Sequence, residues 1–87
     1  MINQLILVGR ITEIEQDNEI VVACSRTEKN EQGEYETDFI KVYLNNNISD
    51  SVKEYCKVGD LVGVKGRIES GNIIKALKVS FLSTAKE

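Results

Sequence analysis

The segment from Tyr35 to Asn45 holds the residue types and spacing that could do chemistry. Its alternate positions mix aromatic rings with an amine: Tyr35, Thr37, Phe39, Lys41, Tyr43 and Asn45. An extended strand turns alternate side chains to one side, so these residues would share a surface. Single-stranded nucleic acid suits such a surface, because bases stack on rings whatever their sequence and cations contact phosphates. A half-solvated strand also favours Tyr and Phe, but a Phe39 flanked by polar residues favours the binding interpretation.

Later segments add further cations to this candidate surface. Lys65 and Arg67 are two positions apart and would share one face of a strand, and Lys75 lies on the next segment. The predicted base-stacking residues are Phe39 first, then Tyr43 and Tyr35. The predicted phosphate contacts from the residues alone are Lys41, Lys65 and Arg67. The remaining lysines at 53, 57 and 78 are interpreted as solubilising.

The chain lacks the groups that most enzymes use. It has no histidine, so the commonest general base and metal ligand is missing. Cys24 and Cys56 have no imidazole to activate them and no metal-ligand spacing, and we interpret both as buried, inert thiols. There is no P-loop and no dinucleotide fingerprint. We therefore expect no enzymatic activity, no catalytic residue, no metal, no cofactor and no small-molecule substrate.

Length and composition indicate one soluble globular domain. The chain has 87 residues, of which 41% are hydrophobic and 29% charged, and its net charge is −3. No apolar run approaches the ~18 residues of a membrane helix, and the start lacks the basic segment of a signal peptide. We expect a cytoplasmic protein with one domain at residues 1–82 and a short end at 83–87.

Acidic and basic residues are distributed unevenly. Residues 1–38 hold nine acids and three bases, whereas residues 39–87 hold five acids and eight bases. An acidic protein can still bind nucleic acid through a local basic face, although long-range attraction is then weak. The four glutamates between positions 28 and 36 are interpreted as a solvated hairpin loop.

The hydrophobic pattern predicts five strands and one helix. The strands are expected at residues 2–14, 19–27, 35–45, 60–69 and 73–82, and the helix at residues 48–57. Ser51 with Glu54 fits a capping box, and Asn47 or Ser49 could cap an earlier start. Gly59 is expected to end the helix in the left-handed conformation.

Five strands with one helix between the third and the fourth is the element order of the OB-fold, a small Greek-key barrel. We therefore predict an all-β barrel whose first and fourth strands pair. Those strands carry similar strings, residues 7–11 and 64–68, each bent at a glycine. The residues expected to be mostly buried are Ile6, Val8, Ile20, Val22, Ile40, Val42, Leu44, Val62, Val64 and Val79.

The first predicted strand is apolar on both alternating sets of residues. A small barrel buries only one face of a strand, so the second face calls for another covering surface. An apolar strand of this kind invites pairing with a further chain. We therefore predict a homodimer or homotetramer that forms through residues 2–8.

Several strings resemble bacterial and phage single-stranded DNA-binding proteins. Residues 1–11 (MINQLILVGRI) resemble their first strand, and Ser25–Thr27 resembles the end of their second. Gln32–Glu34 followed by Thr37–Ile40 is similar to their hairpin and third strand, and residues 52–66 are similar to their helix and fourth strand. The resemblance covers about residues 1–82, and the order and spacing of the strings carry it.

The resemblance implies an OB-fold that binds single-stranded DNA without sequence preference, usually as a homotetramer. In that family the position of Phe39 carries an aromatic residue that stacks on bases. The positions that fall where basic or polar residues line the path of the DNA are Arg10, Arg26, Lys41 and Arg67. The first strand of the family also takes part in subunit contacts.

The chain departs from the family pattern at several places. Asn45 and the segment Thr27–Lys29 stand where many relatives have further stacking aromatics, and residues 70–72 replace a long loop. The sequence also carries no acidic-tipped tail, which relatives use to recruit repair and replication enzymes. These departures indicate either a minimal version, of phage or mobile-element type, with reduced affinity, or a relative whose DNA binding has faded.

The leading hypothesis is a non-enzymatic protein that protects single-stranded DNA in replication, recombination or repair. The alternative is an OB-fold adaptor that acts mainly through protein contacts, like the primosomal relatives of the family. A third, weaker option is RNA binding, because fold does not fix function. Oligo-dT and oligo-U titrations at two salt concentrations would discriminate among the three.

Overall fold

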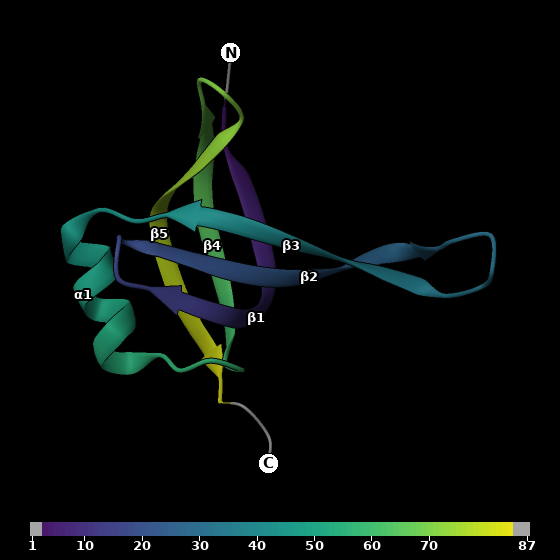
Figure 1. Cartoon of the computed structure of the whole chain (residues 1–87), viewed down its shortest axis with the longest axis horizontal. Helices are drawn as coiled ribbons and strands as arrows, with labels where there is room; N and C mark the ends of the chain where they lie inside the picture. The colour runs from purple at the N-terminus through teal and green to yellow at the C-terminus, as the bar shows by residue number, and fades with distance from the viewer. Residues whose placement is uncertain (1–2, 85–87) are drawn as a thin grey trace.

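The computed structural model describes residues 3–84, which form five strands and one helix (Figure 1). The strands are β1 (Leu5–Glu15), β2 (Glu19–Lys29), β3 (Tyr35–Tyr43), β4 (Leu61–Glu69) and β5 (Ile73–Ser83), and the helix is α1 (Asn46–Tyr55). The number, order and type of the elements match the prediction. The start of the predicted first strand, residue 2, lies outside the described residues.

The strands close into a barrel in the order β1-β2-β3-β5-β4. Neighbours along the barrel are antiparallel except β3 and β5, which pair in parallel at Val42–Ile74 and Tyr43–Lys75. β1 pairs with β4 through Leu5–Arg10, as predicted, and with β2 from Arg10 onward. This arrangement confirms the predicted OB-fold barrel.

Gly9 comes directly before Arg10, the residue at which β1 passes from β4 to β2. An ideal Cβ at this position would lie 2.2 Å from the backbone oxygen of Ala23 on β2. No real Cβ tolerates that distance from a backbone atom, so only glycine lets the two strands approach this closely. The bend predicted from the sequence therefore has a definite cause, which is the contact between β1 and β2.

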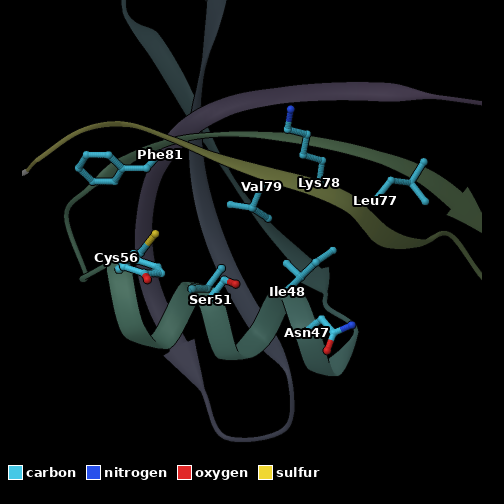
Figure 2. A pocket seen from close by; sticks show the side chains of 10 residues that line it. Asn47, Ile48, Ser51, Cys56, Leu77, Lys78, Val79 and Phe81 are labelled. Carbon is cyan, nitrogen blue, oxygen red and sulfur yellow. The ribbon is translucent and has the colours of Figure 1, made fainter.

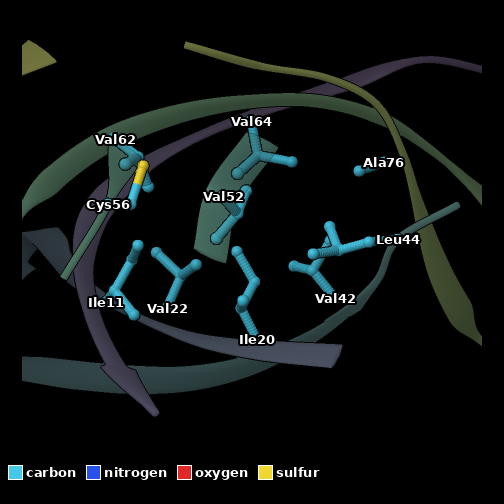
Figure 3. Packing of buried hydrophobic residues seen from close by; sticks show 10 residues of the cluster. All are labelled: Ile11, Ile20, Val22, Val42, Leu44, Val52, Cys56, Val62, Val64 and Ala76. Atoms are coloured by element: carbon cyan, nitrogen blue, oxygen red, sulfur yellow. The ribbon is translucent and has the colours of Figure 1, made fainter. Parts of the chain in front are cut away.

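The barrel interior is filled by apolar side chains from every strand and from α1 (Figure 3). The buried set consists of Ile11, Ile20, Val22, Val42, Leu44, Val52, Cys56, Val62, Val64 and Ala76. Six of the ten residues predicted to be buried belong to it, while Ile40 and Val79 are half-buried. Val52 lies in the middle of this cluster in Figure 3, so α1 closes one end of the barrel.

The prediction that Ile6 and Val8 are mostly buried is wrong for the single chain. Their side chains are 75% and 54% exposed, because they point outward from β1 and no element of residues 3–84 covers them. Leu7, on the opposite set, packs against the core. β1 therefore carries apolar side chains on both of its faces, but the barrel core buries only one of these faces.

The helix begins and ends two residues earlier than predicted. The side chain of Asn45 accepts a hydrogen bond from the backbone N–H of Ile48 at 2.8 Å, so Asn45 is the N-cap and the capping alternatives at 47, 49 and 51 are wrong. Cys56 ends the helix in an extended conformation. Gly59 does adopt the predicted left-handed conformation, with φ of 97°, but in the turn that leads into β4.

Candidate nucleic-acid interface

Three aromatic residues follow one another on the outer side of β3, and we call Tyr35, Phe39 and Tyr43 the aromatic row. They are four positions apart, which is about 13 Å along a strand. Phe39 is 69% exposed and Tyr35 59% exposed, whereas Tyr43 is half-buried. The inward residues between them, Ile40 and Val42, pack in or against the core. The alternation predicted from the sequence is therefore present.

Phe39 lies where the sheet offers an open space beside its ring. Its partner across the strands is Ala23, whose small side chain leaves the ring uncovered on that side. The partner of Ala23 on β1 is Arg10, so the cation lies in the same cross-strand row. The Arg10 guanidinium donates a hydrogen bond to the backbone oxygen of Gly59 at 3.0 Å, which turns it toward the turn before β4.

Lys41 sits between Phe39 and Tyr43 but already has a counterion. Its amine lies 3.6 Å from the carboxylate of Glu19, whose side chain is only 15% exposed. The Glu19 carboxylate, followed by that of Glu15, raises the pKa of Lys41 above its ordinary value. The lysine is therefore charged at neutral pH, and a phosphate must compete with Glu19 for it.

The β2–β3 hairpin extends beyond the barrel as a twisted arm (Figure 1). Arg26 holds the arm at its base: it donates two hydrogen bonds to Asp38 at 3.0 Å and forms an ion pair with Glu36 at 3.0 Å. The bond from Arg26 lowers the pKa of Asp38. The pairing register slips between Ser25 and Lys29, so Arg26 lies where the two strands lose their regular ladder.

Tyr35 lies on the arm, away from the other two rings along β3. The amine of Lys29, its cross-strand partner, sits 5.7 Å from the centre of the Tyr35 ring. This distance is typical of a cation–π contact, which covers one face of the ring. The other face of the ring would have to accept a base if Tyr35 acts as a platform.

Lys65 and Arg67 lie on β4, which is separated from β3 by β5 in the strand order of the barrel. Both are exposed on the outer side, as the sequence predicts for two residues sharing one face of a strand. The Arg67 guanidinium is paired with the carboxylate of Glu69. The predicted phosphate contacts therefore divide into two groups on different parts of the barrel wall.

Of the two thiols predicted to be buried, Cys56 is buried but Cys24 is only half-buried. Burial, and the carboxylates of Asp38 and Asp60 respectively, raise the pKa values of Cys24 and Cys56, so both thiols stay protonated at neutral pH. Among residues 3–84 no cluster of three or more metal-ligating side chains occurs. Over the same residues, no helix is long and apolar enough to cross a membrane.

A mainly apolar cleft of about 390 Å³ lies between α1 and β5 (Figure 2). Ile48 and Cys56 line it from the helix, and Val79 and Phe81 line it from the strand. None of the eight predicted binding residues lines this cleft. The aromatic row and the cleft are therefore separate features.

Sequence reasoning missed the partners that restrain the predicted cations. Glu19, Glu36 and Asp38 each neutralise a residue that the resemblance places along the DNA path. Glu19 and Lys41 are far apart in the sequence and meet only through the β2–β3 register. The only sequence feature that indicated such acidic partners was the excess of acids in residues 1–38.

Comparison with known proteins identifies the class of this barrel. The profile described as the single-strand binding protein family matches residues 2–80. The chain is 37% identical to single-stranded DNA-binding protein 2 of Staphylococcus aureus (strain Mu50), and 36% identical to single-stranded DNA-binding protein 1 of strain COL. The alignments cover 83% of this chain in both cases, and 57% and 48% of the relatives. The chain thus spans about half the length of the curated relatives it matches.

Solved structures agree with the sequence comparison. The mitochondrial single-stranded DNA-binding protein Rim1 of S. cerevisiae superposes with a TM-score of 0.76 at 16% identity, covering 95% of this chain and 97% of that one. The small single-stranded DNA-binding protein of Streptomyces coelicolor gives a TM-score of 0.70 at 18% identity, covering 94% and 95%. The chain belongs to the single-strand binding protein family, a non-enzymatic family of DNA-binding proteins, which confirms the predicted family and the prediction that it is not an enzyme.

Proposed function

We propose that this protein binds single-stranded DNA without sequence preference and protects it during replication, recombination or repair in the bacterial cytoplasm. The observation that carries the proposal is Phe39, a large aromatic residue that is 69% exposed on β3 of a family barrel. Its exposed ring presents the flat apolar face on which a base would stack. The neighbouring rings and cations supply the stacking and phosphate contacts that a single strand requires.

The proposed binding residues differ in their solvent exposure and in whether another residue of the protein already contacts them. Phe39 is open to the solvent, Tyr43 is half-buried, and Tyr35 is covered on one face by Lys29. Lys65 is exposed, and no salt bridge joins it to another residue of the described chain. The other proposed phosphate contacts, each held by a protein partner, are Lys41, Arg67, Arg10 and Arg26.

The test is a titration of labelled oligo-dT with wild type, Phe39→Ala and Tyr55→Ala. Tyr55 is a matched control because it is 70% exposed but lies on α1. We expect Phe39→Ala to weaken binding by about 1–3 kcal/mol without changing the salt dependence, because stacking releases no counterions. Tyr55→Ala should bind like wild type. A folded Phe39→Ala variant that binds as tightly as wild type would remove the aromatic row from the mechanism.

The alternative function, an adaptor acting through protein contacts, is favoured by one specific observation. The acids beside Lys41 and Arg26 neutralise cations that a strong DNA binder would leave free. Wild type that fails to bind oligo-dT at low salt would favour the adaptor. Binding of oligo-U as tightly as oligo-dT would instead show that the strand can be RNA.

We further propose that the protein is a homodimer or homotetramer assembled through β1. The segment Leu5–Gly9 pairs with β4 along one edge, and no strand of residues 3–84 pairs with its other edge. Exposed Ile6 and Val8 lie on this segment. Light scattering should give at least twice the protomer mass of 9.8 kDa, and Val8→Asp should shift the protein toward the monomer. A wild-type monomer at tens of micromolar contradicts this assembly.

A further inference from the structure

We propose that the tip of the β2–β3 arm docks on β5 of a second copy of this chain. The tip offers three acids, Glu28, Glu31 and Glu34, which we call the tip acids. The strand offers Lys75 and Lys78, which we call the β5 lysines. The proposal rests on the proposed assembly through β1 and deepens it, because it names a second contact between copies and the residues that make it.

The arm carries a charge that suits a cationic surface. Residues 26–38 hold five acids and two bases, which gives a net charge of −3. Residues 61–83, which span β4 and β5, hold four bases and one acid, which gives a net charge of +3. An acidic arm repels phosphates, whereas it is attracted to a surface of the opposite sign. The two segments are therefore complementary in charge.

The tip acids are exposed, and within residues 3–84 no salt bridge involves them. The two acids nearer the barrel differ, because Arg26 holds both Glu36 and Asp38. The side chain of Asn30 fixes the backbone of the tip by accepting two hydrogen bonds from backbone N–H groups, each at 3.0 Å. The tip therefore presents its acids from a hydrogen-bonded turn.

The β5 lysines face like charges across the sheet. Lys78 is the cross-strand partner of Lys65, and Lys75 is the partner of Arg67. Like charges in directly opposed positions destabilise a sheet. Arg67 is balanced by Glu69, whereas no salt bridge of the described chain, residues 3–84, involves either β5 lysine. Acids from another copy would relieve this repulsion.

The surface that contains Lys78 continues the exposed apolar segment of β1. Ile6 is the partner of Lys65 on β4, and Lys65 is the partner of Lys78 on β5. Neighbouring strands lie about 4.8 Å apart, so this row spans about 10 Å. A copy that covers Ile6 therefore lies close to Lys78.

The arm is long enough to reach such a neighbour. It points away from its own barrel (Figure 1), and its six residues 26–31 extend about 20 Å. None of the salt bridges within residues 3–84 joins a tip acid to a β5 lysine, so one chain does not make this contact alone. Because every copy carries both the arm and β5, two copies can exchange the contact reciprocally.

The test reverses each side of the contact in turn. The tip variant is Glu31→Lys/Glu34→Lys, and the β5 variant is Lys75→Glu/Lys78→Glu. Light scattering over a dilution series gives the dissociation constant of the assembly, at about 50 mM and about 500 mM salt. All four positions are exposed, so the melting temperatures should stay close to that of wild type.

We expect each variant alone to assemble about tenfold more weakly at low salt, because attractions become repulsions. Total charge alone predicts the opposite for the tip variant, since two Glu→Lys changes move the net charge from −3 to +1, which is closer to zero. An equimolar mixture of the two variants should assemble about as tightly as wild type, because each basic tip then meets an acidic β5. At high salt the separate variants should approach wild type.

The matched control is Lys53→Glu/Lys57→Glu, which changes the charge by the same amount at exposed positions on and after α1. Mixed with the tip variant, it gives the same two net charges as the test mixture. We expect this control mixture to leave the assembly weak, because β5 of both proteins is still basic and repels the lysines of the reversed tip.

Two results would overturn the proposal and leave the assembly through β1 in place. Wild-type dissociation constants in both variants would show that the arm does not contact β5. Equal recovery in the test mixture and the control mixture would show that only total charge matters. A monomeric wild type would remove the assembly and the arm contact together. Titration of oligo-dT with wild type tests the DNA-binding proposal separately.

Discussion

The outer face of β3 and the outer face of β4–β5 belong to the same barrel wall but differ in how their charges are balanced. On β3 and the adjoining arm, aromatic rings alternate with cations that acids hold at 3.0–3.6 Å. On β4–β5 there are no rings among residues 61–80, and cations oppose one another across the two strands. The aromatic row and the opposed cations of β4–β5 therefore lie on different strands.

This division has a physical advantage for a protein with a negative total charge. Under the proposed function, acids beside the aromatic row lower the electrostatic attraction there, so stacking would supply most of the affinity. The exposed cations of β4 would supply the salt-dependent part.

The largest effect is expected from a substitution in β1, the strand that pairs with both β4 and β2 and so connects the two faces. Gly9→Ala would place a Cβ 2.2 Å from the backbone oxygen of Ala23. Because a backbone oxygen cannot move aside cheaply, we expect a loss of about 3 kcal/mol in the free energy of unfolding. Urea denaturation measures this loss, and hydrogen exchange should show protection falling first in β2 and β3.

Gly63→Ala is the matched control for that substitution. Gly63 lies on β4 opposite Val8, and an added Cβ would meet only the Leu82 side chain, at 3.7 Å. This contact is ordinary van der Waals distance, so the control should not lose stability. Equal unfolding midpoints for the two variants would contradict the role assigned to Gly9.

The sequence predicted the barrel because its elements are set by local patterns. Alternation in β3, glycine in β1 and the turn at residues 70–72 all appear in the structure near the expected positions. The burial of Ile6 and Val8 was predicted wrongly, because hydrophobic patterning cannot distinguish a face covered by the chain's own core from one left open. The helix start was also missed, since several polar residues could serve as the cap.

The candidate site was less predictable, because it depends on the strand register. The sequence indicates Phe39 and Lys41 by alternation, but it does not show that Glu19 lies beside Lys41. Similarly, Lys78 looks like a solubilising residue until the register places it opposite Lys65. Single positions can be read from residue type, whereas charge balance requires knowing which strands are neighbours.

A second prediction removes the acid beside a cation of β3, so that this cation, like Lys65 on β4, has no salt bridge within residues 3–84. Glu19→Gln removes the carboxylate 3.6 Å from the Lys41 amine and frees that lysine for a phosphate. We expect tighter oligo-dT binding and a salt slope steeper by about 0.7, which corresponds to one added phosphate contact. Fluorescence titrations at several salt concentrations measure both quantities.

Glu13→Gln is the matched control for Glu19→Gln. Glu13 is exposed on β1, opposite Val21, and no cation of residues 3–84 forms a salt bridge with it. The control should therefore change affinity slightly through total charge and leave the slope unaltered. Identical slopes in the two variants would show that Lys41 does not reach a phosphate even when it is free.

The smallest expected effect concerns Asp38, which helps to hold Arg26 at the base of the arm. The bond from Arg26 lowers the pKa of Asp38 in the folded state, so this contact adds stability above the ordinary carboxylate value of about 3.9 and loses it as the pH falls through the lowered value. Asp38→Asn should therefore flatten the loss of urea stability below about pH 4 and run parallel to wild type above pH 5. Glu36 still holds Arg26 in that variant, at 3.0 Å, so oligo-dT affinity at neutral pH should rise only slightly. An unchanged acid profile in Asp38→Asn would mean that the contact with Asp38 adds nothing to the stability of the arm, and that the ion pair with Glu36 alone holds Arg26 there.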